Sequence, residues 1–108
     1  MTTGPLLVLS TVASAEDANR IAAALVEGEL AACVSVLPPL RSFYRWKGEL
    51  QREEEHLLLI KTRGERFEEL RQALVAMHPY DVPEVLAVAV AAGHEPYLDW
   101  LARGSGMG

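Results

Sequence analysis

The sequence predicts an α+β protein, a ferredoxin-like βαββαβ sandwich with a long hairpin between its second and third strands and a helix at the C-terminus. Two observations carry this prediction. Short apolar runs of strand length alternate with stretches whose apolar residues recur at helical spacing, and prolines and glycines separate them. No repeat or long linker divides the 108 residues. We therefore expect one domain over 1–108, ordered over about 5–102, with a flexible tail over 103–108.

An apolar run and a helix cap mark the first two elements. Residues 6–12 have the length and composition of a buried strand. Ser14 then caps a helix, with Asp17 three residues later in an approximate capping-box position. Gly28 is the predicted stop of this helix. The apolar stripe of the helix consists of Ala18, Ile21, Ala22, Leu25 and Val26.

A long hairpin follows. Residues 31–37 have an extended pattern, the proline pair at 38–39 interrupts it, and it resumes over 41–46. Gly48 is free to take the positive φ that a tight turn requires. The return arm ends at 57–62, so each arm has roughly a dozen residues, against the usual ~5–6.

The second half of the chain repeats the helix–strand order. A helix is predicted over 65–78 and ends at Pro79, an apolar strand follows over 85–91, and Gly93 precedes a short last helix. The residues expected to face inward from these two helices are Phe67, Leu70, Ala73, Leu74, Met77, Tyr97, Leu98 and Leu101.

Charge and cysteine usage exclude several classes of protein. Asp and Glu number 15 against 10 Lys and Arg, a net charge of −5, which argues against binding to nucleic acid. The apolar run near the start is too short for a signal peptide or a membrane span, so no membrane partner is expected. The single cysteine cannot form an internal disulfide, and we expect the reducing cytoplasm.

The strands predict self-association. Two helices cover one face of the sheet, yet the strands are apolar at nearly every position, and a monomer rarely exposes so large an apolar patch. A symmetric oligomer with packed sheets removes this exposure. The aromatic residues expected at the subunit interface are Phe43, Tyr44, Trp46 and Trp100. An aromatic platform for a base or an anion is the alternative for the hairpin.

Three side chains with soft or borderline donor atoms suggest a metal site. Cys33, Met77 and His78 suit copper or zinc, but the chain has no C-x-x-C or H-x-x-x-H spacing. Cys33 and Met77 are alternatively core residues, and His78 is alternatively a helix cap. Copper or another divalent cation is therefore a candidate ligand, and no cofactor is expected to be required.

A stiff polar joint follows the second helix. Pro79 and Pro83 restrain the backbone, and functional groups lie between and beside them. The alternative is a simple connection from helix to strand. The candidate ligand-cleft residues are Tyr80, Glu84, Glu55 and Lys61.

No catalytic residue is predicted. A thiol enzyme would need Cys33 beside a histidine base and an oxyanion motif, which the sequence does not contain. Glycine-rich phosphate loops are also absent. The acidic run at 53–55 is interpreted as a solvated stretch that protects a strand edge, or as a loose site for a hard cation.

Five segments together resemble the CutA divalent-ion tolerance family over roughly 6–101. They are Leu-Ala-Ala-Cys-Val over 30–34, Ser-Phe-Tyr-Arg-Trp-Lys-Gly over 42–48, Lys-Thr at 61–62, His-Pro-Tyr-Asp-Val-Pro-Glu over 78–84 and Tyr-Leu-Asp-Trp over 97–100. The resemblance implies a cytoplasmic, ferredoxin-like homotrimer with the architecture of PII signalling proteins, in which the hairpin reaches neighbouring subunits. It also implies copper or other divalent-ion binding linked to metal tolerance, with no established reaction.

The resemblance implies metal chemistry at Cys33 and His78, with departures nearby. Some relatives have a cysteine where this chain has Ser10, and two histidines where it has Met77 and His78. Many relatives have a glycine where this chain has Pro39. Because Ser10 is a poor ligand for soft metals and Met77 favours cuprous copper, we expect weak copper binding.

Three functional hypotheses remain. The first is a non-catalytic homotrimer that binds divalent or cuprous ions in metal tolerance. The second is a PII-like signalling or small-molecule-binding module that uses the cleft between subunits near Tyr80 and Glu84. The third is an interaction protein in which Cys33 and His78 only pack. The chain is expected to associate with copies of itself, and the sequence does not identify any other protein partner.

Overall fold

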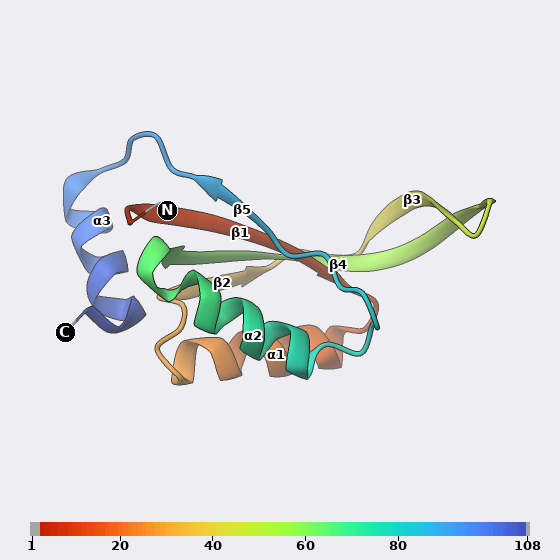
Figure 1. The fold of residues 1–108 in the computed structure, drawn as a ribbon, viewed down its shortest axis with the longest axis horizontal. Helices are drawn as coiled ribbons and strands as arrows, with labels where there is room; N and C mark the ends of the chain where they lie inside the picture. The colour runs from red at the N-terminus through yellow and green to blue at the C-terminus, as the bar shows by residue number, and fades with distance from the viewer. Residues whose placement is uncertain (1–2, 108) are drawn as a thin grey trace.

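A five-stranded antiparallel sheet carries two helices on one face (Figure 1). The computed structural model describes residues 3–107. Its strands are β1 (Pro5–Val12), β2 (Cys33–Val36), β3 (Leu40–Trp46), β4 (Glu49–Arg63) and β5 (Leu86–Ala89). The strand order is β2-β4-β1-β5, and β3 pairs with β4 further along the hairpin. This is the ferredoxin-like arrangement, with β1 and β4 at the centre of the sheet. The predicted fold class is confirmed, and the homotrimer remains a prediction.

Helix α1 (Ala15–Glu27) has the predicted cap at its start and an unpredicted conformation after its end. Oγ of Ser14 accepts a hydrogen bond of 3.0 Å from the backbone N–H of Asp17. Gly28 is the C-cap but has φ −81°, and the left-handed residue is Glu29, with φ 57°. The N–H groups of Glu29 and Leu30 bond the carbonyls of Val26 and Leu25, which is a Schellman motif.

The hairpin has the predicted length, and its first arm is divided. Pro38 and Pro39 separate β2 from β3, while the 15-residue β4 pairs with both. Lys47 and Gly48 both have positive φ, 51° and 81°, as a two-residue turn with a tight twist requires. The hairpin tip therefore projects far from the sheet (Figure 1), and the longest dimension of the molecule is 45 Å.

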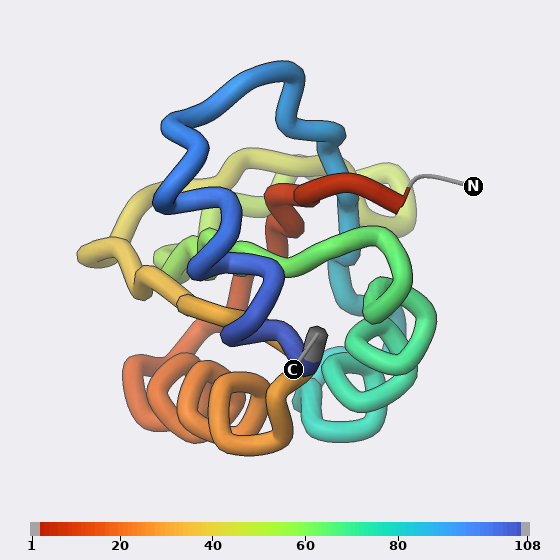
Figure 2. Tube along the Cα trace, turned by 90° about the vertical axis from the view of Figure 1, so that its left-hand side faces the viewer, coloured from red at the N-terminus to blue at the C-terminus, as the bar shows by residue number. Residues whose placement is uncertain are grey.

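The core lies between the sheet and helices α1 and α2 (Phe67–Met77), which run side by side (Figure 2). Strand β1 alternates between buried residues that face the helices and half-buried residues on the other face. A single 3₁₀ turn, η1 (Gly64–Arg66), precedes α2. The principal core residues are Leu6, Val8, Val12, Ala18, Ile21, Leu25, Leu58, Ile60, Leu70 and Leu74.

The face of the sheet without helices is apolar, as the strand composition indicates. The side chains of Leu7, Leu9 and Leu59 are half-buried there, and Leu86 and Val88 on β5 are exposed. Their registers place them on adjacent strands. Among the described residues, no helix is long and apolar enough to span a membrane.

The prediction of a flexible tail over 103–108 is wrong for residues 103–107, the part of it that the structure describes. After α3 (Glu95–Ala102), Arg103–Met107 form an ordered turn, η2, in which Ser105 and Gly106 (φ 84°) depart from helical geometry, and Ser105 is fully buried. Oγ of Ser105 donates to the carbonyl of Leu101 over 2.8 Å, and Nε of Arg63 donates to the carbonyl of Ser105 over 3.3 Å. Gly108 lies outside the described residues.

Small residues explain why this segment packs. A Cβ atom at Gly104 would lie 2.9 Å from that of Ala32, so the glycine permits a close backbone approach. The glycine-rich composition predicted a solvated tail. Because glycine has no side chain, the segment instead packs closely against Ala32. Helix α3 and this turn cover the end of the sheet opposite the hairpin tip (Figures 1 and 2).

Candidate functional site

The joint after α2 lies where the hairpin leaves the sheet (Figure 1). Helix α2 ends at Met77, and His78 is its C-cap, with an extended backbone at φ −76° and ψ 138°. An extended residue before Pro79 is expected, because the proline ring disfavours the helical conformation in the preceding residue. The backbone N–H of His78 still bonds the carbonyl of Leu74 over 2.9 Å, so the joint starts from a fixed position.

Both ring nitrogens of His78 are engaged in hydrogen bonds within the chain. Nε2 lies 2.8 Å from the carbonyl oxygen of Thr11, and Nδ1 lies 3.1 Å from the backbone nitrogen of Tyr80. Because a carbonyl only accepts, Nε2 donates to Thr11. Because a backbone N–H only donates, Nδ1 accepts from Tyr80. The imidazole, which is 7% exposed, is therefore the Nε2-protonated tautomer with no free lone pair.

A hydrogen bond between Tyr80 and Glu55 connects the segment after α2 to the base of the hairpin. The Tyr80 hydroxyl donates to Oε2 of Glu55 over 2.7 Å, and Glu55 is only 6% exposed. Burial and, next, the hydrogen bond to the Glu55 carboxylate raise the pKa of Tyr80 well above its usual range. Of the ion pairs among the described residues, none includes Glu55. Glu55 is thus a buried carboxylate whose partner is a neutral hydroxyl.

A cavity of about 660 Å³ opens beside this pair. It combines carboxylates, hydroxyls and the aromatic side chains of the hairpin. Its lining residues are Thr11, Ser42, Phe43, Tyr44, Trp46, Glu55, Tyr80, Asp81, Val82 and Glu84. A volume of this size is typical of small-molecule sites.

Three of the four predicted cleft residues line this cavity, and Lys61 does not. Tyr80, Glu84 and Glu55 lie together, whereas the register pairs Lys61 with Cys33 on β2 and Leu7 on β1. Lys61 is six residues further along β4 than Glu55, roughly 20 Å at strand spacing. Its ammonium donates to Oγ of Ser35 over 2.6 Å, away from Glu55 and Glu84.

Sequence reasoning missed some of the lining. Thr11 and Ser42 come from β1 and β3, and nothing in their local sequence distinguishes them. Phe43, Tyr44 and Trp46 were predicted at a subunit interface, and they also line this cavity. Their side chains, and that of Trp100, are exposed within the single chain.

The residues predicted to hold a metal are not brought together within one chain. Cys33 pairs with Lys61, and Thr11, which binds His78, pairs with Leu57 four residues away along β4, about 13 Å. The ammonium of Lys61 lies 3.7 Å from the sulfur of Cys33 and disfavours a cation there. Over residues 3–107 no group of three His, Cys, Asp or Glu side chains could hold a metal ion. The residues therefore do not fit a resident metal within one chain.

Ser10 also lies apart from Cys33. Ser10 is fully buried on the face of the sheet that the helices cover. By the strand register Cys33 shares the opposite face with Leu7. A cysteine in place of Ser10 would consequently point away from Cys33 within one chain.

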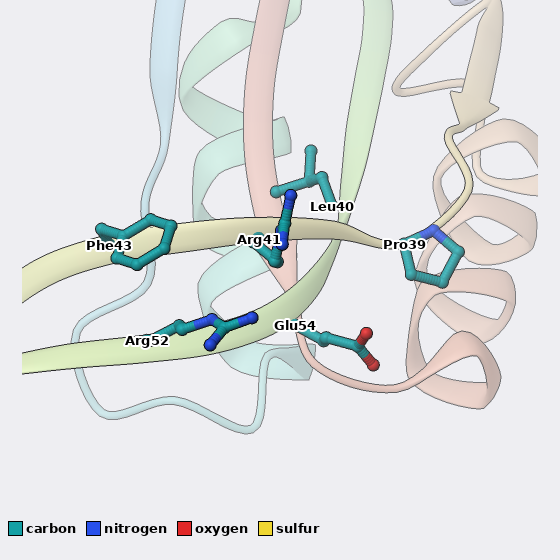
Figure 3. A pocket seen from close by; sticks show the side chains of 6 residues that line it. All are labelled: Pro39, Leu40, Arg41, Phe43, Arg52 and Glu54. Atoms are coloured by element: carbon teal, nitrogen blue, oxygen red, sulfur yellow. The ribbon is translucent and has the colours of Figure 1, made fainter.

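A second cavity, of about 590 Å³, lies along the hairpin on the side that Glu54 faces (Figure 3). The guanidinium of Arg52 lies 5.8 Å from the ring centre of Phe43 across the two strands. Pro39 closes one end of this surface, and Arg41 and Glu54 give it both signs of charge. No residue predicted for the metal or the cleft contributes to it.

The fold and the cavity define a small ferredoxin-like protein with a projecting hairpin and a polar, aromatic cleft at its base. A family model described as CutA1 divalent ion tolerance protein matches residues 6–104. The chain belongs to the CutA family of divalent-ion tolerance proteins.

Relatives agree over nearly the whole chain. The divalent-cation tolerance protein CutA of Thermus thermophilus is 50% identical over 100 residues, which are 93% of this chain and 97% of that protein. A solved structure of Cut A1 from the same organism superposes with a TM-score of 0.92 and 49% identity, covering 94% of this chain and 99% of that chain. The CutA1 of Shewanella sp. SIB1, described as a stable protein, gives 0.94 at 36% identity, covering 98% and 99%.

Proposed function

We propose that this chain acts in divalent-cation tolerance as a homotrimer without catalytic activity. The observation that carries the proposal is the similarity to proteins named for divalent-cation tolerance, which extends over residues 6–104. The cytoplasm remains the setting we propose for it.

The apolar surfaces of the single chain support self-association. Phe43 is 60% and Trp46 is 55% exposed on the projecting hairpin, and Leu86 and Val88 are exposed on the helix-free face of the sheet. Burying these side chains against other copies is favourable, by roughly 25 cal/mol per Å² of apolar surface. Light scattering at micromolar concentration is expected to give three times the chain mass of 11.8 kDa. A monomeric mass would refute the trimer.

Metal binding is proposed to be weak and to involve Cys33 rather than His78. The thiol of Cys33 is half-buried, and a soft cation such as cuprous copper has to compete with the adjacent Lys61 ammonium. The single free lone pair of the His78 ring, on Nδ1, accepts the backbone N–H of Tyr80, and Nε2 carries a proton. In a copper titration followed by calorimetry, Cys33→Ala is expected to weaken binding, whereas His78→Ala is expected to keep the wild-type stoichiometry. Unchanged affinity in Cys33→Ala, or lost stoichiometry in His78→Ala, would contradict this assignment.

The second candidate function is a PII-like small-molecule module. The cavity beside Tyr80 and Glu55 favours it, because it combines an apolar aromatic lining with a buried charge. A thermal-shift screen of nucleotides and small metabolites tests this candidate. A stabilising compound that binds at one equivalent per chain supports it, and the absence of any hit across the screen counts against it.

A further inference from the structure

We propose that the cavity beside Glu55 and Tyr80 binds a small organic cation with an ammonium group. The inference deepens the second candidate function, on which it rests, by naming the class of ligand.

Among residues 3–107, Glu55 is a buried carboxylate without a cationic partner. It is 6% exposed, it lines the cavity, and the hydrogen bond that it receives comes from the neutral hydroxyl of Tyr80 through Oε2. A buried carboxylate that lacks an opposite charge is costly, and an added cation relieves that cost. The cavity therefore favours a positively charged occupant.

The remaining lining selects an organic cation over a metal ion. Tyr44 and Trp46 contribute aromatic side chains, and aromatic faces attract ammonium groups while giving a divalent ion no ligand atoms. The carboxylates of Asp81 and Glu84 also line the cavity, but the described residues contain no group of three acidic or other donor side chains arranged to hold a metal. A hydrated divalent ion demands several oxygen ligands at short range.

The volume, the polar lining and the charge of the cavity agree with a small cationic ligand. The volume of about 660 Å³ falls within the range of small-molecule sites. The hydroxyls of Thr11 and Ser42 supply acceptors for the polar groups of a ligand. The net charge of −5 and the acidic residues at the cavity attract cations over a distance.

Choline and its uncharged analogue 3,3-dimethylbutan-1-ol test the proposal, because they share a shape and differ in charge. Calorimetry on the full chain at low salt is expected to show choline binding at least tenfold more tightly than the neutral analogue. Glu55→Gln, which preserves the shape of the side chain, is expected to weaken choline binding at least tenfold. The matched control is Glu54→Gln, which removes the same charge from a residue that lines the other cavity of the hairpin, and it is expected to bind as the wild type does.

A second variant keeps the test valid if Glu55→Gln does not fold. Glu84→Gln removes a second carboxylate that lines the cavity without altering the buried Glu55, and it is expected to weaken choline binding severalfold. Equal binding of choline and its neutral analogue, or wild-type choline affinity in Glu55→Gln, would overturn the proposal.

One further outcome would overturn it while leaving the proposed function intact. If choline does not bind and Glu55→Gln lowers the mass of the oligomer, the cation that pairs with Glu55 is a basic side chain of a second copy. Preserved trimer mass and copper binding together with no choline binding would refute only the ligand class. A monomeric wild type would instead refute the proposed trimer.

Discussion

The hydroxyl of Tyr80 lies 2.7 Å from Oε2 of Glu55 and joins the loop after α2 to the base of the hairpin. The two residues are 25 positions apart in the chain. Removing the hydroxyl by Tyr80→Phe leaves the buried carboxylate without its donor. We expect a loss of about 1.5–3 kcal/mol in the free energy of unfolding. Urea denaturation at fixed protein concentration measures it, and Tyr97→Phe, at an exposed tyrosine, should have almost no effect.

The same pair predicts a stability change at high pH. The pKa of Tyr80 in the folded protein is raised above its usual 10.0, so the folded state holds the phenol proton more tightly than the unfolded state does. The contribution of Tyr80 to stability is therefore complete below pH 10 and falls as the pH rises above it. The difference in unfolding free energy between the wild type and Tyr80→Phe should shrink above pH 10. A difference that grows with pH would contradict the pKa shift.

Ser10 carries a hydroxyl that is fully buried and has no hydrogen-bond partner among the described residues. Such a group loses its hydration on folding without compensation. We expect Ser10→Ala to stabilise the protein by about 1 kcal/mol in chemical denaturation. Ser35→Ala is the contrasting variant, because its hydroxyl accepts from the ammonium of Lys61, and it should destabilise the protein. Destabilisation by Ser10→Ala would mean that a partner exists.

Glu29 occupies the left-handed position of the Schellman motif after α1, with φ 57°. A side chain is strained in this conformation and glycine is not. We expect Glu29→Gly to stabilise the protein by about 0.5–1 kcal/mol. Glu27→Gly removes the same charge from the last residue of α1, where glycine should cost up to about 1 kcal/mol. Equal thermal-unfolding shifts for the two variants would show that charge, rather than backbone conformation, decides the effect.

Gly104 tests whether the C-terminal turn packs in solution. A Cβ atom there would lie 2.9 Å from that of Ala32, so Gly104→Ala should destabilise the protein by about 1–3 kcal/mol. At Gly4 an added Cβ meets no atom within 4 Å, and Gly4→Ala should be nearly neutral. Identical unfolding midpoints for wild type and Gly104→Ala would instead support the predicted flexible tail.

Much of the fold could be predicted from local chemistry. The capping residue Ser14, the division of the hairpin arm at Pro38 and Pro39, and the turn at Gly48 all act through neighbouring residues. The apolar spacing of the helices and strands likewise reports which face is buried. The C-terminal turn was missed because its packing depends on Ala32, which is distant in the chain.

Some residues of the candidate site could likewise be recognised from the sequence, and others could not. Tyr80 and Glu84 were recognisable because a stiff, polar segment between two prolines stands out in the sequence. That Glu55 lies beneath Tyr80 while Lys61 lies beside Cys33 follows from the register of β4 against its neighbours. A local pattern does not specify which residues of two long strands face each other when many positions are apolar.

By itself, the sequence determined the order of the elements, the faces that are buried and the residue types at the joint, because these properties arise from interactions over a few positions. The tertiary structure alone decided that both nitrogens of His78 are engaged and that Glu55 is buried with no cation beside it among the described residues. Those outcomes depend on strand register and loop closure, which bring groups from distant parts of the chain within hydrogen-bonding distance.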